Sequence, residues 1–144
     1  MNPQEVPLNS LAGLNAEAMA ALLAAAADIA LVIDRQGHIT HVAVGNPELS
    51  TIGHNRWQGK AWLDVATAES RPKITALLED ARQGRARRWR HLNYASSQGD
   101  YVPMLFSAVQ AGPKGPVVAF GRDLRQLASL QQRLVGAQLS LERD

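Results

Sequence analysis

Hydrophobic and polar residues alternate with different periods along this chain, and each period predicts a different element. Residues 16–27 are mostly alanine, which favours a helix but buries little area per residue. Asn15 can cap this helix with its side chain, and Glu17 places a negative charge in the first turn, where the helix dipole favours it. Residues 1–14 contain two prolines and show no periodicity, so we expect a flexible lead.

A hairpin is predicted directly after this helix. Residues 29–33 form a short β-branched run, and a turn that ends at Gly37 follows it. Residues 38–44 then alternate between two sets of side chains, which is typical of a strand. The alternation would place Ile39, His41 and Ala43 on one face, and Thr40, Val42 and Val44 on the other.

The remaining pattern predicts one longer helix and more strands. Gly and Pro divide the middle of the chain into short pieces until Arg71-Pro72 opens a helix that ends near Gly84. Strands are predicted over residues 86–95, 101–111 and 117–122. In the second of these, one face should look into the core; it consists of Val102, Met104, Phe106 and Ala108. The expected fold is therefore α+β, a five-stranded antiparallel sheet with helices on one face and an N-terminal helix.

The last predicted element, residues 123–144, is an amphipathic helix with a heptad pattern. Leu127, Leu134 and Leu141 recur every seven residues, and Leu130 and Ala137 fall three residues after the first two. Leu124 extends this apolar stripe backward. The pattern indicates a coiled-coil helix that leaves the domain and pairs with another copy, and the alternative is a helix that packs on its own sheet.

Composition limits the class of protein. The chain has 144 residues, of which 46% are hydrophobic and 19% charged, and these values predict a single globular domain. There is no long apolar run and no signal peptide, so we expect a cytoplasmic protein without a membrane span. The absence of cysteine excludes disulfides, thiolate nucleophiles, iron–sulfur clusters and zinc sites with cysteine ligands.

The formal net charge of the chain is only +2, but several arginines are concentrated in one short segment. The candidate basic patch consists of Arg82, Arg85, Arg87, Arg88 and Arg90. Such a cluster can neutralise phosphates, but nucleic-acid binders usually present it on a recognisable helix or on a sheet platform with aromatic residues. We therefore expect a solvated helix end and strand face, with nucleic-acid contact as the alternative.

Two segments carry a resemblance to a known family. Residues 57–65 read WQGKAWLDV, in which a glycine and a basic residue precede a short hydrophobic piece that ends in an acidic residue, and this resembles a segment of PAS domains. Residues 120–125 read FGRDLR. Together with the glutamine-containing residues 130–144, they resemble the N-terminal domain and linker helix of the PpsR/CrtJ family, photosynthesis-gene repressors from purple bacteria.

The resemblance implies a PAS-like domain over residues 15–122, followed by a linker helix over 123–144. It implies a non-catalytic module of a transcriptional repressor, which forms a homodimer or higher oligomer and contacts an antirepressor or a bacteriophytochrome. Members of the family bind DNA through a helix-turn-helix, for which these residues contain no candidate. We therefore expect the linker helix to continue into domains beyond Asp144.

The alternative function is a PAS sensor that binds a small ligand or a tetrapyrrole such as haem, since the family has been linked to tetrapyrrole sensing. The candidate ligands for haem iron would be His38, His41, His54 and His91. His38 and His41 would point to opposite faces of a strand, so a shared metal is not expected. We predict no cofactor. A cavity lined by polar groups would favour the sensor, and a filled core would favour the interaction module.

No motif predicts an enzyme. Ser70, His54 and Asp64 could be drawn as a triad, but the sequence around Ser70 is not a nucleophile elbow. Residues 112–116 read GPKGP, which is a turn rather than a phosphate-binding loop. We therefore predict no catalytic residues.

The three tryptophans are expected to differ in burial. Trp62 should join the short-helix region to the sheet. Trp57 and Trp89 are either partly buried or part of a contact surface.

Overall fold

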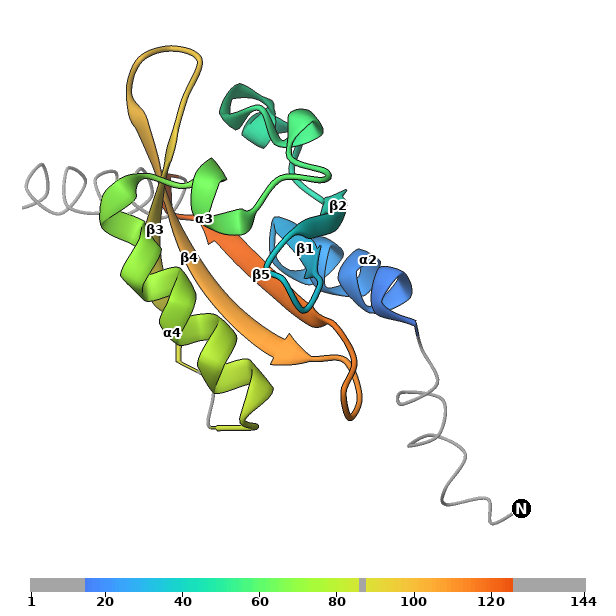
Figure 1. Cartoon of the computed structure of the whole chain (residues 1–144). Coiled ribbons are helices and arrows are strands. Elements are labelled where there is room, and N and C mark those ends of the chain that lie inside the picture. Colours follow the sequence, from blue (N-terminus) through green and yellow to red (C-terminus); the bar gives the residue numbers. More distant parts are fainter. Residues whose placement is uncertain (1–14, 86–87, 126–144) are drawn as a thin grey trace, which may run out of the picture.

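The five strands form one antiparallel sheet in the order β2-β1-β5-β4-β3 (Figure 1). The computed structural model describes residues 15–85 and 88–125. The strands are β1 (Ile29–Ile33), β2 (Ile39–Val44), β3 (Arg90–Ala95), β4 (Tyr101–Gln110) and β5 (Val117–Asp123). Strands β1 and β5 meet in the centre although residues 34–116 separate them in sequence, so the first hairpin and the last three strands depend on each other.

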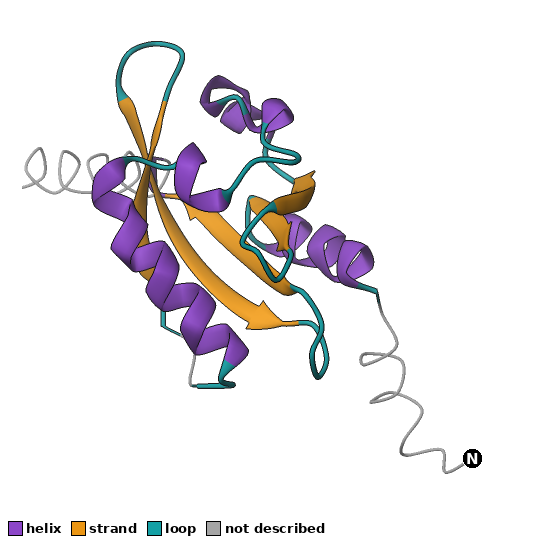
Figure 2. Ribbon diagram, viewed as in Figure 1, coloured by secondary structure: helices purple, strands orange, loops and turns teal. Residues whose placement is uncertain are grey.

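Helices cover both faces of this sheet (Figure 2). The α-helices are α2 (Ala16–Ala26), α3 (Trp62–Val65) and α4 (Arg71–Arg82). Three 3₁₀-helices, η1 (Pro47–Ile52), η2 (His54–Arg56) and η3 (Ala68–Ser70), occupy the region between β2 and α4. The Asn15 side chain accepts a hydrogen bond from the Ala18 N–H at 2.7 Å, which confirms the predicted cap of α2.

The larger core lies between the sheet and α4. Ile74, Leu77 and Leu78 of α4 are buried against the face of β4 that carries Met104 and Phe106. All four residues predicted to line that face of β4 are buried, so the prediction for this strand is confirmed. Lone strands cannot bury such side chains, and packing against an amphipathic helix supplies the missing wall.

A second, smaller core lies on the opposite face, under α2. Ala20 and Ala24 of this helix pack against Val32 of β1 and Val118 and Phe120 of β5. The contact surface of the helix is largely methyl groups, so α2 lies close to the sheet but buries little area per residue. Leu22, one of its larger side chains, is 60% exposed.

The predicted alternation of β2 is wrong at one point, and a bulge is the reason. Val32 pairs with His41 and Ile33 pairs with Ile39, so Thr40 is an extra residue in β2. Its hydroxyl donates to the Val32 carbonyl at 3.2 Å. After the bulge the faces exchange, and Val42 joins Ile39 at the larger core while Ala43 packs on the smaller one.

The predicted fold class is confirmed, with differences at element ends. Strand β3 begins at Arg90, four residues later than predicted, and β5 extends one residue further, to Asp123. The predicted flexible lead, residues 1–14, lies outside the described residues. Within residues 15–85 and 88–125, every helix is too short or too polar to cross a bilayer.

Candidate functional site

The predicted oligomer interface falls mostly beyond the described part of the chain. Leu124 is described and half-buried, directly after β5. The other members of the stripe lie outside the described residues; these are Leu127, Leu130, Leu134, Ala137 and Leu141. What the structure does describe is how the segment after β5 is attached to the domain. We call the residues that make this attachment the junction: Asp28, Glu48, Asp123 and Arg125.

An ion pair between Asp123 and Arg125, two positions apart in the sequence, lies at the centre of the junction. The Arg125 guanidinium donates from Nη2 to Asp123 Oδ2 at 2.7 Å and from Nε to both carboxylate oxygens at 3.1 Å. The backbone N–H of Arg125 also donates to Asp123 Oδ1, at 2.9 Å. These bonds hold the backbone and the side chain of Arg125 against the Asp123 carboxylate directly after β5.

The junction joins the end of β5 to two earlier segments. Asp28, just before β1, accepts the Asp123 N–H on its Oδ2 at 2.7 Å. The carbonyl of Asp28 accepts the N–H groups of Gly45 and Asn46, after β2. Arg125 donates to the Glu48 carbonyl of η1 at 3.3 Å. Asp123 and Arg125 are therefore bonded to the residue before β1 and to η1, respectively.

Burial strengthens the ion pair of the junction. The Asp123 side chain is fully buried and that of Arg125 is 35% exposed. The Asp123 carboxylate is compensated by hydrogen bonds, as a buried charge must be, and the same bonds raise the pKa of Arg125. Sequence reasoning missed this set, although an Asp-x-Arg spacing that ends a hydrophobic strand was a visible cue.

The candidate basic patch is not one surface in the structure. Arg82 donates to the backbone carbonyls of Asp34 and Arg35, in the turn between β1 and β2. Arg85 and Arg90 instead pair with Asp80, at 3.3 and 3.7 Å, and so connect the end of α4 to β3. Arg88 is exposed, and Arg87 lies outside the described residues. The structure therefore brings together only part of the predicted cluster.

Aromatic rings fill the space between the sheet and the short helices. Trp62 is fully buried, as predicted, and its indole donates to the Tyr94 hydroxyl at 2.9 Å. The Tyr94 ring stacks on Trp57 with centroids 5.0 Å apart and lies 5.7 Å from Phe106. Trp57 is only 4% exposed, so it is not part of a contact surface, whereas Trp89 is 44% exposed beneath the Arg122 guanidinium. Burial raises the pKa of Tyr94 well above its usual range.

The interior does not fit a tetrapyrrole held by histidine. His38, His41 and His91 are exposed, and His54 is half-buried in η2. Burial lowers the pKa of His54. His41 pairs with Glu17 of α2, on the opposite side of the sheet from the larger core. The described residues hold no group of three His, Asp or Glu side chains arranged to bind a metal ion.

The residues considered above as a catalytic triad make structural contacts instead. Ser70 Oγ accepts the backbone N–H of Asn93 at 2.9 Å and lies 3.0 Å from the Thr67 hydroxyl. These bonds join the start of α4 to β3. Ser70 is buried, while Asp64 is exposed.

Comparison with known proteins shows what this arrangement resembles. Residues 23–129 match the family described as the PAS fold. The domain of the sensory box sensor histidine kinase/response regulator from Geobacter sulfurreducens aligns with a TM-score of 0.54 and 24% identity, covering 74% of this chain and 92% of that one. The PAS domain of a Colwellia psychrerythraea protein aligns with a TM-score of 0.53 and 14% identity, covering 69% and 87%.

A curated relative is similar over almost the whole chain. Protein CrtJ from Rhodobacter capsulatus is 29% identical over 136 residues, which are 94% of this chain. The chain spans 29% of the length of that relative.

Proposed function

This chain belongs to the PAS fold family, and on that premise we propose that it is a non-catalytic regulatory module of a transcriptional repressor of photosynthesis genes. The module self-associates through the helix predicted over residues 123–144. Its output is the geometry of that helix, which further domains of the repressor read.

The observation that carries this proposal is the junction. Arg125 is bonded both to Asp123 at the end of β5 and to the Glu48 carbonyl of η1. A displacement of η1, or of the segment around Asp28, changes the position of the Arg125 guanidinium and therefore the start of the linker. This arrangement suits transmission of a conformational change rather than bond-making chemistry.

The filled interior supports an interaction module over a ligand sensor. Ile33, Val102, Met104 and Phe106 are all fully buried in the larger core. Trp62 and Tyr94 occupy the neighbouring space, and the Trp62 indole N–H donates to the Tyr94 hydroxyl. A sensor would need convergent polar groups around an interior cavity.

The remaining functional assignments rest on the likeness to Protein CrtJ. We propose a homodimer or higher oligomer, an antirepressor or bacteriophytochrome as partner, and DNA binding through a helix-turn-helix elsewhere in the protein. A repressor of this class acts in the cytoplasm.

The size of the protein in solution tests the proposal. Replacement of two apolar residues of the stripe, Leu127→Glu with Leu134→Glu, places charges in the paired seam, and we expect a monomer where the parent chain is an oligomer. Light scattering measures the mass. A chain ending at Arg125 should also be a monomer in sedimentation equilibrium, and it keeps the junction intact.

The matched control adds the same two charges to the other side of the predicted helix. Ser129→Glu with Gln132→Glu lies off the stripe and should leave the oligomer unchanged. An unchanged mass for the Leu127→Glu, Leu134→Glu variant would show that the linker is not the interface. Circular dichroism of each variant establishes that the PAS domain is folded.

A further inference from the structure

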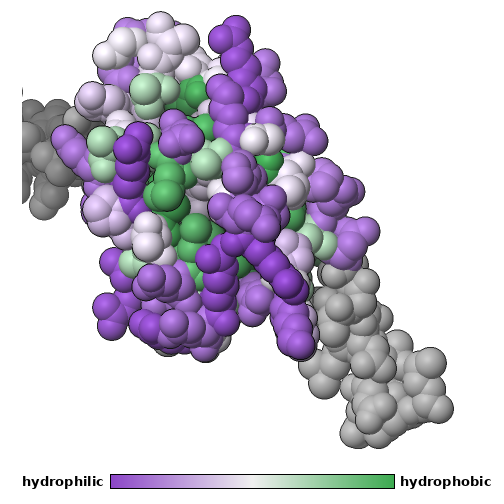
Figure 3. Space-filling view, viewed as in Figure 1, coloured by the Kyte–Doolittle hydropathy of each residue, from purple (hydrophilic) through white to green (hydrophobic). Residues whose placement is uncertain are grey.

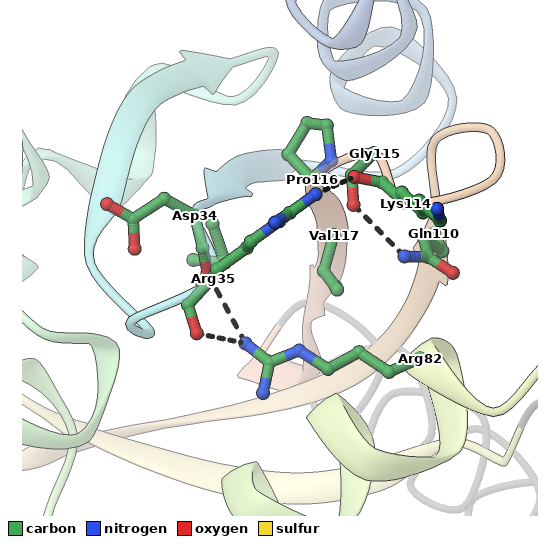
Figure 4. A pocket seen from close by; sticks show the side chains of 9 residues that line it. Asp34, Arg35, Arg82, Gln110, Lys114, Gly115, Pro116 and Val117 are labelled. Atoms are coloured by element: carbon green, nitrogen blue, oxygen red, sulfur yellow. Dashed lines mark hydrogen bonds between the residues drawn. The ribbon is translucent and has the colours of Figure 1, made fainter.

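A pocket of about 530 Å³ lies at the end of the sheet, away from the junction. The turn between β1 and β2, the turn between β4 and β5 and the end of α4 form its walls (Figure 4). We call it the turn pocket. Figure 4 shows the side chains of Arg35 and Arg82 entering it from two different walls. This volume is within the range of sites for small molecules.

Apolar residues form the inner side of the turn pocket. Ile33 and Val117, paired neighbours in β1 and β5, lie there but are buried, so the half-buried Pro116 ring supplies the apolar surface that a ligand can reach. On the face of the molecule drawn in Figure 3, hydrophobic groups gather at the centre and hydrophilic groups lie around and across them. The residues that line the turn pocket are polar apart from Ile33, Gly115, Pro116 and Val117. A ligand in the turn pocket would thus meet an apolar base and a polar rim.

The rim carries positive charge on Arg35, Arg82 and Lys114. Arg82 Nη2 donates to the carbonyls of Asp34 and Arg35 at 3.3 and 3.2 Å, and Arg35 Nη2 donates to the Lys114 carbonyl at 3.2 Å. All these acceptors are neutral backbone groups. Within residues 15–85 and 88–125, none of the three cations forms an ion pair, and Nε and Nη1 of both arginines have no protein acceptor.

Asp34, the carboxylate that lines the turn pocket, is bonded to its own turn. Asp34 Oδ1 accepts the backbone N–H groups of Gln36 and His38, at 3.0 and 2.9 Å, and so stabilises its own turn. In Figure 4 the Asp34 carboxylate points away from Arg35 and Arg82. The turn pocket therefore keeps a net positive charge although Asp34 lies at its edge.

We propose that the turn pocket binds a small organic anion through a carboxylate or phosphate group. Guanidinium groups present parallel N–H donors that match the oxygens of both groups, and a second cation on the facing wall adds to the attraction. The apolar part of the ligand would lie on the Pro116 ring. Binding would draw the turns and α4 together, because Arg35 and Arg82 already connect them.

Simple aromatic acids provide the probes. Phthalate supplies carboxylates, phenyl phosphate supplies a phosphate, and benzyl alcohol has the apolar ring without the charge. Each is titrated at constant ionic strength while amide shifts of the ¹⁵N-labelled chain are followed. We expect saturable shifts for at least one anion at residues 33–37 and 82 and at the non-proline residues of 110–117, and none for benzyl alcohol.

Two variants test the residues. Arg35→Gln with Arg82→Gln removes both guanidinium groups and should weaken anion binding by about tenfold or more. Lys114→Gly removes the third charge at a residue with φ of +61°, a conformation that glycine adopts without strain, so the turn should fold at least as well. We expect it to weaken binding by about threefold.

The control removes two arginines that lie outside the turn pocket. Arg88→Gln with Arg122→Gln changes the net charge as much as the double variant and should bind the anions as the parent chain does. Lack of saturable binding by both anions would overturn the proposal. Equal weakening in the control pair would overturn it as well, since the effect would then be one of net charge.

Discussion

The Tyr94 hydroxyl and the Trp62 indole show how a single hydrogen bond fixes the interior. Both side chains are fully buried, and their polar groups meet at 2.9 Å. A buried donor without an acceptor loses its hydration without compensation, so this bond matters more when one partner is removed than its own strength suggests.

Tyr94→Phe should lower the free energy of unfolding by roughly 1–3 kcal/mol, because it leaves the Trp62 N–H buried and unpaired. Urea denaturation measures the change. Tyr101→Phe removes a hydroxyl from a tyrosine that is 65% exposed and should have almost no effect. Equal stability of the two variants would contradict this account of the interior.

The lowered pKa of His54 predicts part of the pH dependence of the free energy of unfolding. Burial lowers its pKa below the ordinary value of 6.5, so the unfolded chain takes up a proton at a higher pH than the folded chain does. Stability should therefore fall as pH decreases from about 7.5 to about 5.5, since the unfolded state binds more protons there.

His54→Gln should make this decrease smaller. The comparison is the shift in urea midpoint between the two pH values, for the parent chain and for the variant. His91→Gln changes an exposed histidine and serves as the control. A decrease of the same size in His54→Gln would exclude His54 as its source.

Helix α2 is held to the sheet by close approach rather than by large side chains. A Cβ added to Gly45, after β2, would lie 2.1 Å from the carbonyl oxygen of Ala24. Gly45 therefore sets the distance between the end of α2 and the sheet. Ala20 and Ala24 can pack closely only because of this distance.

Gly45→Ala should displace α2, with a loss of roughly 1–3 kcal/mol in the free energy of unfolding. Hydrogen exchange of the α2 amides gives the local readout, and we expect faster exchange there than in α4. Leu22→Ala changes an exposed residue of the same helix and should leave the exchange unchanged. Protection of α2 in Gly45→Ala equal to the parent would contradict the role of the close approach.

At the scale of elements, local patterns were sufficient for most of the fold. The cap at Asn15, the proline-opened α4 and the inward face of β4 follow from neighbouring residues alone. The bulge in β2 could not be predicted in this way, because Thr40 becomes an extra residue only when β1 pairs with β2. The packing of α2 on the face opposite α4 likewise depends on where β5 inserts.

At the scale of the whole molecule, sites formed by residues far apart in the sequence could not be predicted from the sequence. Arg82 and Asp34 are 48 residues apart, and Asp28 and Asp123 are 95 residues apart. Their meeting depends on the complete sheet. The cluster of arginines was visible in the sequence, but its division between Asp80 and the turn pocket was not.

The alternative of a haem sensor is testable on the intact chain. The larger core is filled and the histidines lie at the surface or half-buried, so we expect haemin to give the spectrum of the free or weakly adsorbed compound. An absorbance titration measures this. A saturable Soret shift that disappears in His54→Gln would contradict the interaction module and favour the sensor.

The bulge at Thr40 has a consequence for how the length of this chain can vary. Loss of Thr40 would leave Ile39 and His41 paired with the neighbouring residues Ile33 and Val32 of β1, so the two sides of the strand would keep their side chains. Loss of a further residue has no bulge to absorb it and would exchange the two sides of the strand. The turn over residues 111–116 has no such constraint, because it closes two strands beyond their last pair. Relatives of this protein should thus differ in length mainly at the second turn, and by no more than the bulge residue through the first strand pair.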